Sequence, residues 1–386
     1  MSRAILVLLT LALAVTVPSP RLDAQASKDL RIWMIDMEGG GGTLFVAPSG
    51  ESLLIDTGNP GPAAARDAAR IMEAVKDSGI KQIDHLVTTH YHGDHIGGLQ
   101  ELAKQIPIRH FIDHGDNIQP TGSGADALPA YKELYAKAKH TVAKPGDKIP
   151  IKGMDITVVA SAGQTIKTAL PGAGRPNPFC ANAKRIADDT SENGQSVATV
   201  LTFGQFRMVH LGDLTWNGEL ALSCPNNLLG KADLFHASHH AQQRAAAMSN
   251  PEALVHGIRP RVIVSSNGLR KGAEVAAMKV LLSTPGVEDV WQMHASQLSG
   301  QEFTVPGVFI SNWADGGEAS LPVAAIVRDD TNANLFRTSD NKEAPPAPVH
   351  NGQSYYFKAT VQPDGTFTIT NQRNGFSKTY RKVSGT

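Results

Sequence analysis

The hydrophobic positions of this chain fall into many short runs that end at turn residues. Near the beginning, LRIWMIDM and TLFVAPSGESLLIDTG contain three apolar stretches separated by glycines and by Pro-Ser-Gly, which predicts three strands. The run Gly39–Gly42 is interpreted as a tight turn and not as a phosphate-binding loop, because a strand-like stretch follows it instead of a helix. Residues 62–78 show apolar positions at helical spacing and stop at Gly79, which predicts a helix with a glycine cap.

Strand and helix patterns continue to alternate along the chain. IDHLVTTH predicts a buried strand, and helices are expected from about Ile96 to Gln105 and over residues 127–139. A strand is expected over residues 154–159. Four more strand-like runs follow in SVATVLTFG, FRMVHLGD, ADLFHASHH and PRVIVSSNG. This order of elements indicates a layered α/β domain.

The pattern weakens in two regions. Residues 116–194, including GAGRPNPFC, read mostly as loop, and we interpret them as a wall of an active site. Beyond about Leu321, NKEAPPAPVHNG reads as a linker, and YYFKATVQPDGTFTITNQ predicts a β-hairpin that turns at Asp364-Gly365. We therefore expect a main domain over residues 27–320, followed by a linker and a C-terminal β-hairpin extension over residues 321–386.

The first 26 residues predict a cleavable signal peptide. Arg3 precedes the apolar run ILVLLTLALAVTV, and Ala24-Gln25-Ala26 supplies a cleavage site of small residues. A retained membrane anchor is the alternative, although the run is shorter than the roughly 20 residues of a comfortable span. No later stretch is apolar enough to cross a bilayer. The expected product is an exported protein, periplasmic or secreted.

Composition narrows the function classes. The chain has 386 residues, of which 41% are hydrophobic, and 36 basic residues balance 36 acidic ones. This composition is typical of a packed globular protein, and the zero net charge argues against a protein that tracks long nucleic acid. Two cysteines are too few for a disulfide-rich mini-protein or a four-cysteine zinc module.

The most informative stretch for chemistry is THYHGDHIGG, which begins at Thr89. His90 ends an apolar strand, and residues two apart in extended backbone point the same way, so His90 and His92 should converge. Asp94 and His95 then begin the next helix. Three imidazoles and a carboxylate within six residues suit zinc or a similar divalent ion. The alternative is a loop of solvated or core histidines, which would repel one another on protonation.

These motifs resemble those of a known family. HYHGDH is similar to the H-x-H-x-D-H signature of the metallo-β-lactamase superfamily, and Asp56-Thr57-Gly58 is similar to its first motif. HLGDL places Asp213 where that family has its metal-bridging aspartate, and SHH places His239 and His240 where it has a late histidine ligand. The resemblance covers roughly residues 30–320. It implies a four-layer αββα sandwich, to which this chain would add its C-terminal β extension.

One branch of the superfamily looks most similar. The opening IDMEGGGGTLFV, the segment Asn193-Gly-Gln-Ser196 and the paired histidines resemble the metallo-hydrolase domain of DNA-uptake competence channel proteins and the related choline-phosphate esterases. The resemblance implies one or two zinc ions, with manganese or iron(II) as alternatives. It also implies that a metal-bound hydroxide attacks the substrate. The ligands that it implies are His90 and His92 for one ion, Asp94, His95 and His240 for the other, and Asp213 between them, with Asp94 counted among the catalytic residues.

Two features differ from the family's pattern. Most members with two metals have a histidine before the strand that precedes the bridging aspartate, but here that segment reads DDTSENGQS. The first ion is therefore left with Asn193, Glu192 or water, and Asn193 is also expected to bind substrate. In addition, Ala241-Gln242 replaces the Gly-Ser that follows the paired histidines in the competence-type pattern.

The paired histidines need separate roles if the backbone there is extended, since neighbouring side chains then point to opposite faces. The resemblance assigns His240 to the metal and His239 to the substrate, where it would hold a phosphoryl oxygen or protonate the leaving group. His114 and His236 are either core residues or lie next to the site. Cys180 and Cys224 flank the segment that carries Asn193 and Asp213, so a disulfide between them is expected, with two unpaired thiols as the alternative.

Three functions remain open at this point. The first is hydrolysis of a small or medium phosphodiester, which the branch resemblance favours. The second is hydrolysis of a lactone or cyclic amide, including β-lactams, with the same metal site. The third is a binding or assembly protein that keeps the fold without catalysis, against which the full set of ligands speaks. For both hydrolase functions the expected partner is a small-molecule or phosphodiester substrate. The sequence has no strong nucleic-acid-binding signature. After removal of the predicted signal peptide it has no transmembrane segment.

Overall fold

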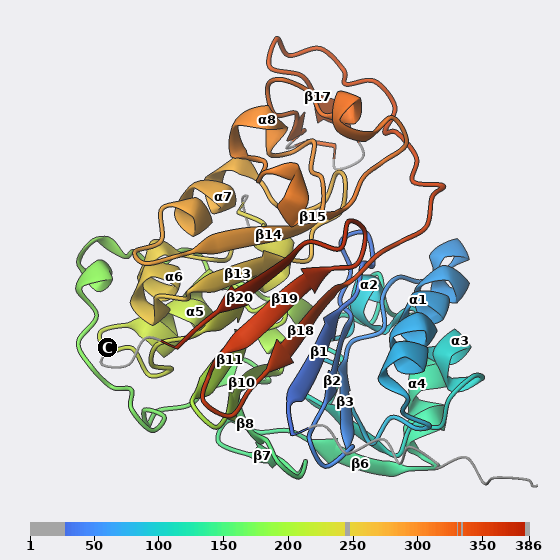
Figure 1. The fold of residues 1–386 in the computed structure, drawn as a ribbon, viewed down its shortest axis with the longest axis vertical. Coiled ribbons are helices and arrows are strands. Elements are labelled where there is room, and N and C mark those ends of the chain that lie inside the picture. Colours follow the sequence, from blue (N-terminus) through green and yellow to red (C-terminus); the bar gives the residue numbers. More distant parts are fainter. Residues whose placement is uncertain (1–27, 244–247, 330, 333–334, 383–386) are drawn as a thin grey trace, which may run out of the picture.

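Two large sheets form the centre of the computed structural model, which describes residues 28–243, 248–329, 331–332 and 335–382 (Figure 1). The first sheet has the strand order β20-β19-β18-β1-β2-β3-β4-β5-β6. Its strands are β1 (Leu30–Met34), β2 (Thr43–Val46), β3 (Ser52–Ile55), β4 (His85–Val87), β5 (His110–Asp113), β6 (Lys139–Val142), β18 (Phe357–Val361), β19 (Phe367–Asn371) and β20 (Ser377–Tyr380).

The second sheet has the order β15-β14-β13-β12-β11-β10-β8-β7, with β9 paired to β8. Its central strands run parallel from β11 to β15, which brings their carboxyl ends to one edge. The strands are β7 (Lys148–Ile149), β8 (Asp155–Ser161), β9 (Gln164–Thr165), β10 (Ala198–Phe203), β11 (Phe206–His210), β12 (Leu234–His236), β13 (Val262–Ser265), β14 (Asp289–His294) and β15 (Ile310–Asn312).

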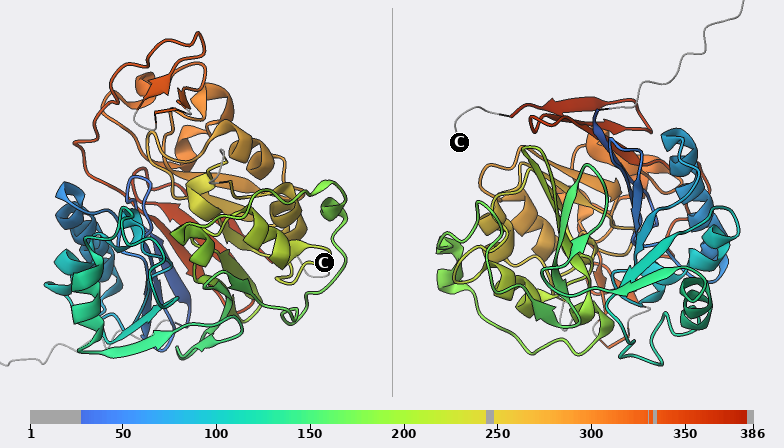
Figure 2. Two further views of the ribbon diagram at one scale, coloured as in Figure 1. Left: turned by 180° about the vertical axis from the view of Figure 1, so that it is seen from behind. Right: turned by 90° about the horizontal axis from the view of Figure 1, so that it is seen from below.

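Helices cover the outer face of each sheet (Figures 1 and 2). One apolar cluster lies between the sheets and joins Phe45 of β2 to Met208 of β11. A second lies between the first sheet and its helices, and a third between the second sheet and its helices. These three cores define four layers and confirm the predicted αββα class. The helices are α1 (Pro62–Ser78), α2 (Gly93–Ile96), α3 (Leu99–Ala103), α4 (Leu128–Tyr135), α5 (Trp216–Ser223), α6 (Glu252–Ile258), α7 (Val275–Leu282) and α8 (Gly300–Phe303).

The C-terminal extension completes the first sheet. The predicted hairpin is present as β18 and β19, and β18 pairs antiparallel with β1 at the other end of the chain. A third strand that the sequence pattern did not predict, β20, pairs with β19. Phe357, Phe367 and Tyr380 are fully buried in the core between the sheets, and the Tyr380 hydroxyl donates to Asp289 over 2.6 Å. The extension is therefore an integral part of the sandwich.

The helix expected from Ile96 to Gln105 is divided into two short helices, α2 and α3. The break falls at Gly97 and Gly98, which pack directly on the backbone that follows β3. A Cβ atom at Gly97 would lie 2.1 Å from the nitrogen of Pro60, and one at Gly98 would lie 2.1 Å from the oxygen of Thr57. This close approach fixes α2, with its two predicted ligands, against the first sheet.

Residues 1–26, which carry the predicted signal peptide, lie outside the described residues. Among the helices that the structure describes, none combines the length and the apolar character that a membrane crossing requires.

The predicted disulfide between Cys180 and Cys224 is present. It joins the one-turn helix η1 (Pro178–Asn182) to the end of α5 and leaves no free cysteine in the chain. The bond therefore ties the long loop over residues 171–191 to the second sheet's outer layer.

We expect reduction of this disulfide to destabilise the protein by about 4 kcal/mol, because it closes a loop of 44 residues and restricts the unfolded chain. Urea unfolding of oxidised protein and of a Cys180→Ser, Cys224→Ser double variant measures the difference. Two titratable thiols in denatured, unreduced protein would contradict the pairing.

Candidate metal centre

The imidazoles of His90 and His92 converge just beyond β4. Nε2 of His90 lies 3.0 Å from Nδ1 of His92, as the two-residue spacing predicted. Nε2 of His92 is 3.0 Å from the side-chain oxygen of Gln119, which can only accept a hydrogen bond. The ring proton of His92 therefore lies on Nε2, and its Nδ1 lone pair faces His90.

Four further side chains gather beside this pair. Asp94 and His95 come from α2, Asp213 follows β11, and His240 follows β12, with one ligand atom of each within 4.8 Å of the others. Nε2 of His95 lies 3.2 Å from a carboxylate oxygen of Asp94 and 3.2 Å from one of Asp213. Nε2 of His240 lies 3.3 Å from the same two oxygens. The structure thus brings the six residues predicted as ligands to one place.

Asp213 stands at the centre of the group. Its Oδ2 atom is within 4.0 Å of the Nε2 atoms of four histidines and is 3.9 Å from His90 itself. This places one carboxylate oxygen between the His90–His92 pair and the Asp94–His95–His240 group. A carboxylate in this position can contact two ions at once.

Asp56 orients His95. Its Oδ2 accepts a 2.7 Å hydrogen bond from Nδ1 of His95, and its Oδ1 accepts one of 2.8 Å from the backbone nitrogen of Thr89. Nε2 of His95 consequently faces Asp94 and Asp213. Gly41 makes room for this contact, since a Cβ atom there would lie 2.7 Å from Asp56 Oδ2. The sequence identified Asp56 as part of a motif but not its role.

The paired histidines lie on unusual backbone. His239, His240 and Ala241 have φ values of 50°, 56° and 61°, in the left-handed region that costs a non-glycine residue roughly 1–3 kcal/mol. The sharp turn replaces the extended backbone in which neighbours diverge. Both Nε2 atoms approach Oδ2 of Asp213, at 3.6 Å for His239 and 3.3 Å for His240.

The two histidines nevertheless have different surroundings. Nδ1 of His240 donates to the carbonyl of Ser266 over 3.1 Å, so its Nε2 lone pair faces the carboxylates. Nε2 of His239 lies 3.4 Å from the side-chain amide of Asn193 and 3.3 Å from that of Gln242. His239 therefore borders the predicted substrate-binding residue, whereas His240 borders two predicted ligands.

The buried charges of the cluster support one another. Burial opposes ionisation of Asp94 and Asp213, but neighbouring cationic groups outweigh it and hold both pKa values well below the usual range. Burial likewise opposes protonation of His95, yet the carboxylates of Asp213, Asp94 and Asp56 raise its pKa well above the usual value. Burial and the proximity of His95 lower the pKa of His90. The negative charges of these carboxylates thus favour a positive charge at the centre of the cluster.

The donor set fits a divalent ion such as zinc. The Nε2 atoms of His95 and His240 are buried, lie 3.2–3.3 Å from carboxylate oxygens, and make no well-aligned hydrogen bond among the residues that the structure describes. Such atoms are costly to bury unless another group satisfies them. Imidazole nitrogens and carboxylate oxygens are ligands that zinc accepts.

The segment before β10 contains Glu192 and Asn193, the two residues that the sequence left open as ligands of the first ion. Glu192 is buried, and its carboxylate is occupied by His114 at 2.8 Å and by the backbone nitrogens of Tyr91 and Ile118. It is a structural residue here and is not directed to the cluster. Asn193 is the neighbour that reaches it, and its Oδ1 atom is buried without a partner in the described part of the chain.

Other histidines have structural partners. His114 pairs with Glu192, and His236 bonds to the hydroxyl of Ser266 at 2.6 Å. The sequence missed a second group, in which Asp36, His294 and His350 approach one another. Arg70 lies 3.4 Å from Asp36 and neutralises its charge, so this group ties the C-terminal linker to the end of β1. Its members are far apart in sequence, and no local motif joins them.

Comparisons with known proteins agree with this geometry. A family described as the metallo-beta-lactamase superfamily matches residues 38–175, which include Asp56 and the segment from His90 to His95. Among curated relatives, a hydroxyacylglutathione hydrolase of Erwinia tasmaniensis is 28% identical over 120 residues, 31% of this chain and 37% of that protein. The lactamase-like protein GME11357 of Pestalotiopsis microspora is 23% identical over 224 residues, 57% of this chain and 58% of that protein.

The chain thus spans between about a third and three fifths of the length of these curated relatives. Among solved structures, the metallo-beta-lactamase fold protein YhfI from Bacillus subtilis is similar with a TM-score of 0.41 and 16% identity, covering 68% of this chain and 95% of that one. This chain is therefore similar to the metallo-beta-lactamase superfamily over residues 38–175, a stretch that ends before Asp213 and His240.

Proposed function

We propose that the protein is an exported, metal-dependent hydrolase that acts on a small or medium phosphodiester. The observation that carries this proposal is the group of Asp94, His95, Asp213 and His240, with His90 and His92 beside it. Nitrogen and oxygen donors of six side chains converge there, and two buried imidazole Nε2 atoms face carboxylate oxygens without a well-aligned hydrogen bond among the described residues. A purely structural cluster would satisfy these atoms internally.

The ligand assignment follows the positions of the donors. His90 and His92 would hold one ion, and Asp94, His95 and His240 the other, with Asp213 between them. A divalent ion held there would supply a hydroxide at neutral pH and would stabilise developing negative charge. The chain's own residues supply orientation: Asp56 and Ser266 fix the rings of His95 and His240, and Gln119 fixes that of His92.

The substrate would lie against His239 and Asn193. Their side chains approach each other at 3.4 Å beside Asp213, and Asn193 Oδ1 has no partner among the described residues. His239 can hold a substrate oxygen or protonate the leaving group, and Asn193 can orient the substrate. Phosphodiester chemistry follows the resemblance of IDMEGGGGTLFV and the paired histidines to the competence-type and choline-phosphate esterase branch.

A second candidate is hydrolysis of a lactone, a β-lactam or a related acyl substrate by the same centre. Several curated relatives carry the name hydroxyacylglutathione hydrolase, which adds a hydroxyacyl thioester of glutathione to this class. The third possibility is a binding protein without catalysis, which would give no catalytic role to the nitrogen and oxygen atoms that converge in the cluster.

A substrate panel separates the three. We expect bis-p-nitrophenyl phosphate to be hydrolysed faster than nitrocefin, a lactone or lactoylglutathione, and chelation of the metal to abolish the activity. Faster turnover of any acyl substrate would replace the phosphodiester assignment. No turnover of any compound by metal-loaded protein would favour a binding role.

The proposal of export rests on the apolar run and the small-residue site within residues 1–26 and is supported by the disulfide. Mass spectrometry of the protein recovered from its native compartment tests it, with cleavage after Ala26 as the expected result.

A further inference from the structure

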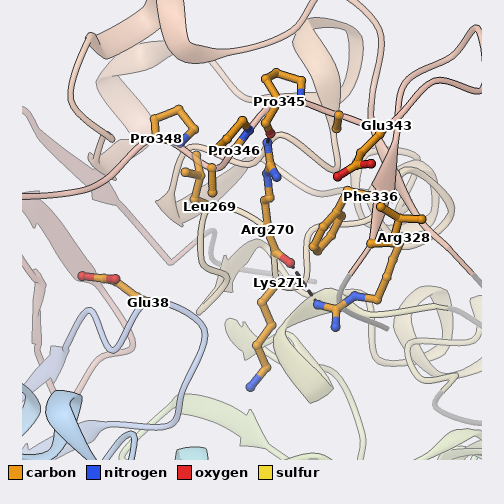
Figure 3. A pocket seen from close by; sticks show the side chains of 13 residues that line it. Glu38, Leu269, Arg270, Lys271, Arg328, Phe336, Glu343, Pro345, Pro346 and Pro348 are labelled. Carbon is orange, nitrogen blue, oxygen red and sulfur yellow. Dashed lines mark hydrogen bonds between the residues drawn. The ribbon is translucent and has the colours of Figure 1, made fainter. Parts of the chain in front are cut away.

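A cavity of about 610 Å³ lies between the loop that follows β13 and the C-terminal part of the chain (Figure 3). One wall is the loop between β13 and α7, with Leu269, Arg270 and Lys271. The other wall comes from the segment that carries the small sheet of β16 (Val327–Arg328) and β17 (Phe336–Arg337), and from the proline-rich run that follows it. Its volume is typical of small-molecule sites.

Specific contacts hold the two walls together. Arg270 donates to the carbonyl of Pro345 over 2.6 Å, and Arg328 donates to the carbonyl of Arg270 over 3.2 Å. The ring of Phe336 lies between the two guanidinium groups, 5.2 Å from that of Arg270 and 4.9 Å from that of Arg328 (Figure 3). The segment NKEAPPAPVHNG, predicted to be a linker, therefore forms part of one wall of this cavity.

Lys271 links this cavity to the metal cluster. Its Nζ atom donates to a carboxylate oxygen of Asp94, a predicted ligand, and its side chain extends away from the prolines (Figure 3). The stem of Lys271 lies on Gly39, where an added Cβ atom would be 3.0 Å from it. Gly39 has a φ of 92°, which glycine adopts without strain. The glycine turn after β1 thus holds the lysine at the end of the cavity nearest the cluster.

The lining carries charges of both signs, and the ammonium of Lys271 also bonds to Asp94 outside it. Arg270, Lys271 and Arg328 face two carboxylates, Glu38 and Glu343. Glu38 is already paired, since its carboxylate contacts Arg66 at 2.9 Å and Arg70 at 2.8 Å. The remaining lining is mostly apolar and consists of Leu269, Leu335, Phe336, Ala344, Pro345, Pro346, Ala347 and Pro348.

We propose that this cavity binds the part of the substrate that lies away from the scissile bond, and that this part is an organic anion whose apolar body rests on the prolines and whose carboxylate or phosphate meets Lys271. The inference rests on the proposed function, because the contact of Lys271 with Asp94 is what places this cavity next to the metal cluster. It also assigns the C-terminal segment a role in substrate selection.

Binding of a matched pair of probes tests the proposal without measuring turnover. Calorimetric titration compares 4-phenylbutyrate with the uncharged 4-phenylbutanamide, on the full-length protein as purified and again after chelation. We expect the carboxylate to bind about tenfold more tightly, as one hydrogen bond between charged groups would provide, and to keep this preference after chelation. Its persistence separates the cavity from the metal, so that failure of the proposed hydrolase would not alter the result.

Two pairs of variants locate the effect. Lys271→Met should remove the preference and Lys271→Arg should retain it. On the opposite wall, where Pro346 is exposed, Pro346→Asp should remove the preference and Pro346→Asn should leave it unchanged. Equal affinities for the two probes, loss of the preference on chelation, or a preference that survives both Lys271→Met and Pro346→Asp would overturn the proposal.

Discussion

Replacing Asp213 by asparagine is expected to lower hydrolytic activity by about a thousandfold or more. The change removes a negative charge that would help to hold the metal, and metal-ion catalysis stabilises a transition state by several kcal/mol. Oδ2 of Asp213 lies within 4.0 Å of Nε2 atoms on four histidines and is buried. Metal content measured by plasma mass spectrometry should fall together with activity.

Asp155→Asn is the matched control for this variant. Asp155 lies on β8, has an exposed carboxylate and pairs only with Lys148 among the cations of the described chain. Because exposed pairs contribute little, this variant should keep full metal content and activity. An Asp213→Asn protein that is folded, carries as much metal as the unaltered protein and retains its activity would show that Asp213 is not a ligand.

His240→Ala and His239→Ala are expected to behave differently. His240 faces both Asp94 and Asp213, so its removal should lower metal content and activity together. His239 approaches Asp213 alone and borders the amides of Asn193 and Gln242. Its removal should leave metal content nearly unchanged and reduce turnover by about 10²- to 10⁴-fold, as loss of a proton-transfer or oxygen-binding group does.

Each variant serves as the control of the other, since both remove one buried imidazole from the same left-handed turn. Metal analysis and thermal unfolding of the two proteins check that the difference does not come from folding. If His239→Ala loses metal while His240→Ala keeps it, the two roles must be exchanged. If both lose metal, the turn supplies two ligands, and His239 takes the place of the histidine that the segment before β10 lacks.

Local sequence patterns predicted many of the strands and helices, and the resemblance to a known family implied their four-layer arrangement. The helix over residues 62–78 and its cap at Gly79 appear with the expected bounds, because the apolar spacing and the terminal glycine act within a few residues. The His90–Asp94 motif could be interpreted for the same reason, since its geometry depends on one strand end and one turn. Predicted ligands that follow different strands, such as Asp213 and His240, were identified through their motifs, whose strand context fixes the edge of the sheet at which they lie.

Features that depend on distant contacts could not be predicted in this way. The break at Gly97 and Gly98 results from the backbone after β3, and the pairing of β18 with β1 joins the two ends of the chain. The left-handed turn at His239 could not be predicted, because the sequence has no glycine or asparagine there to indicate a positive φ. The contact between His114 and the carboxylate of Glu192 likewise joins residues that are 78 positions apart.

The metal content of the purified protein tests the central claim most directly. With His90, His92, Asp94, His95, Asp213 and His240 available as ligands, we expect between one and two equivalents of zinc or a similar divalent ion per chain. A value near one would indicate that the position at His90 and His92, which lacks the family's further histidine, binds its ion weakly. Protein that contains no divalent metal and gains no activity when zinc or manganese is added would contradict the account.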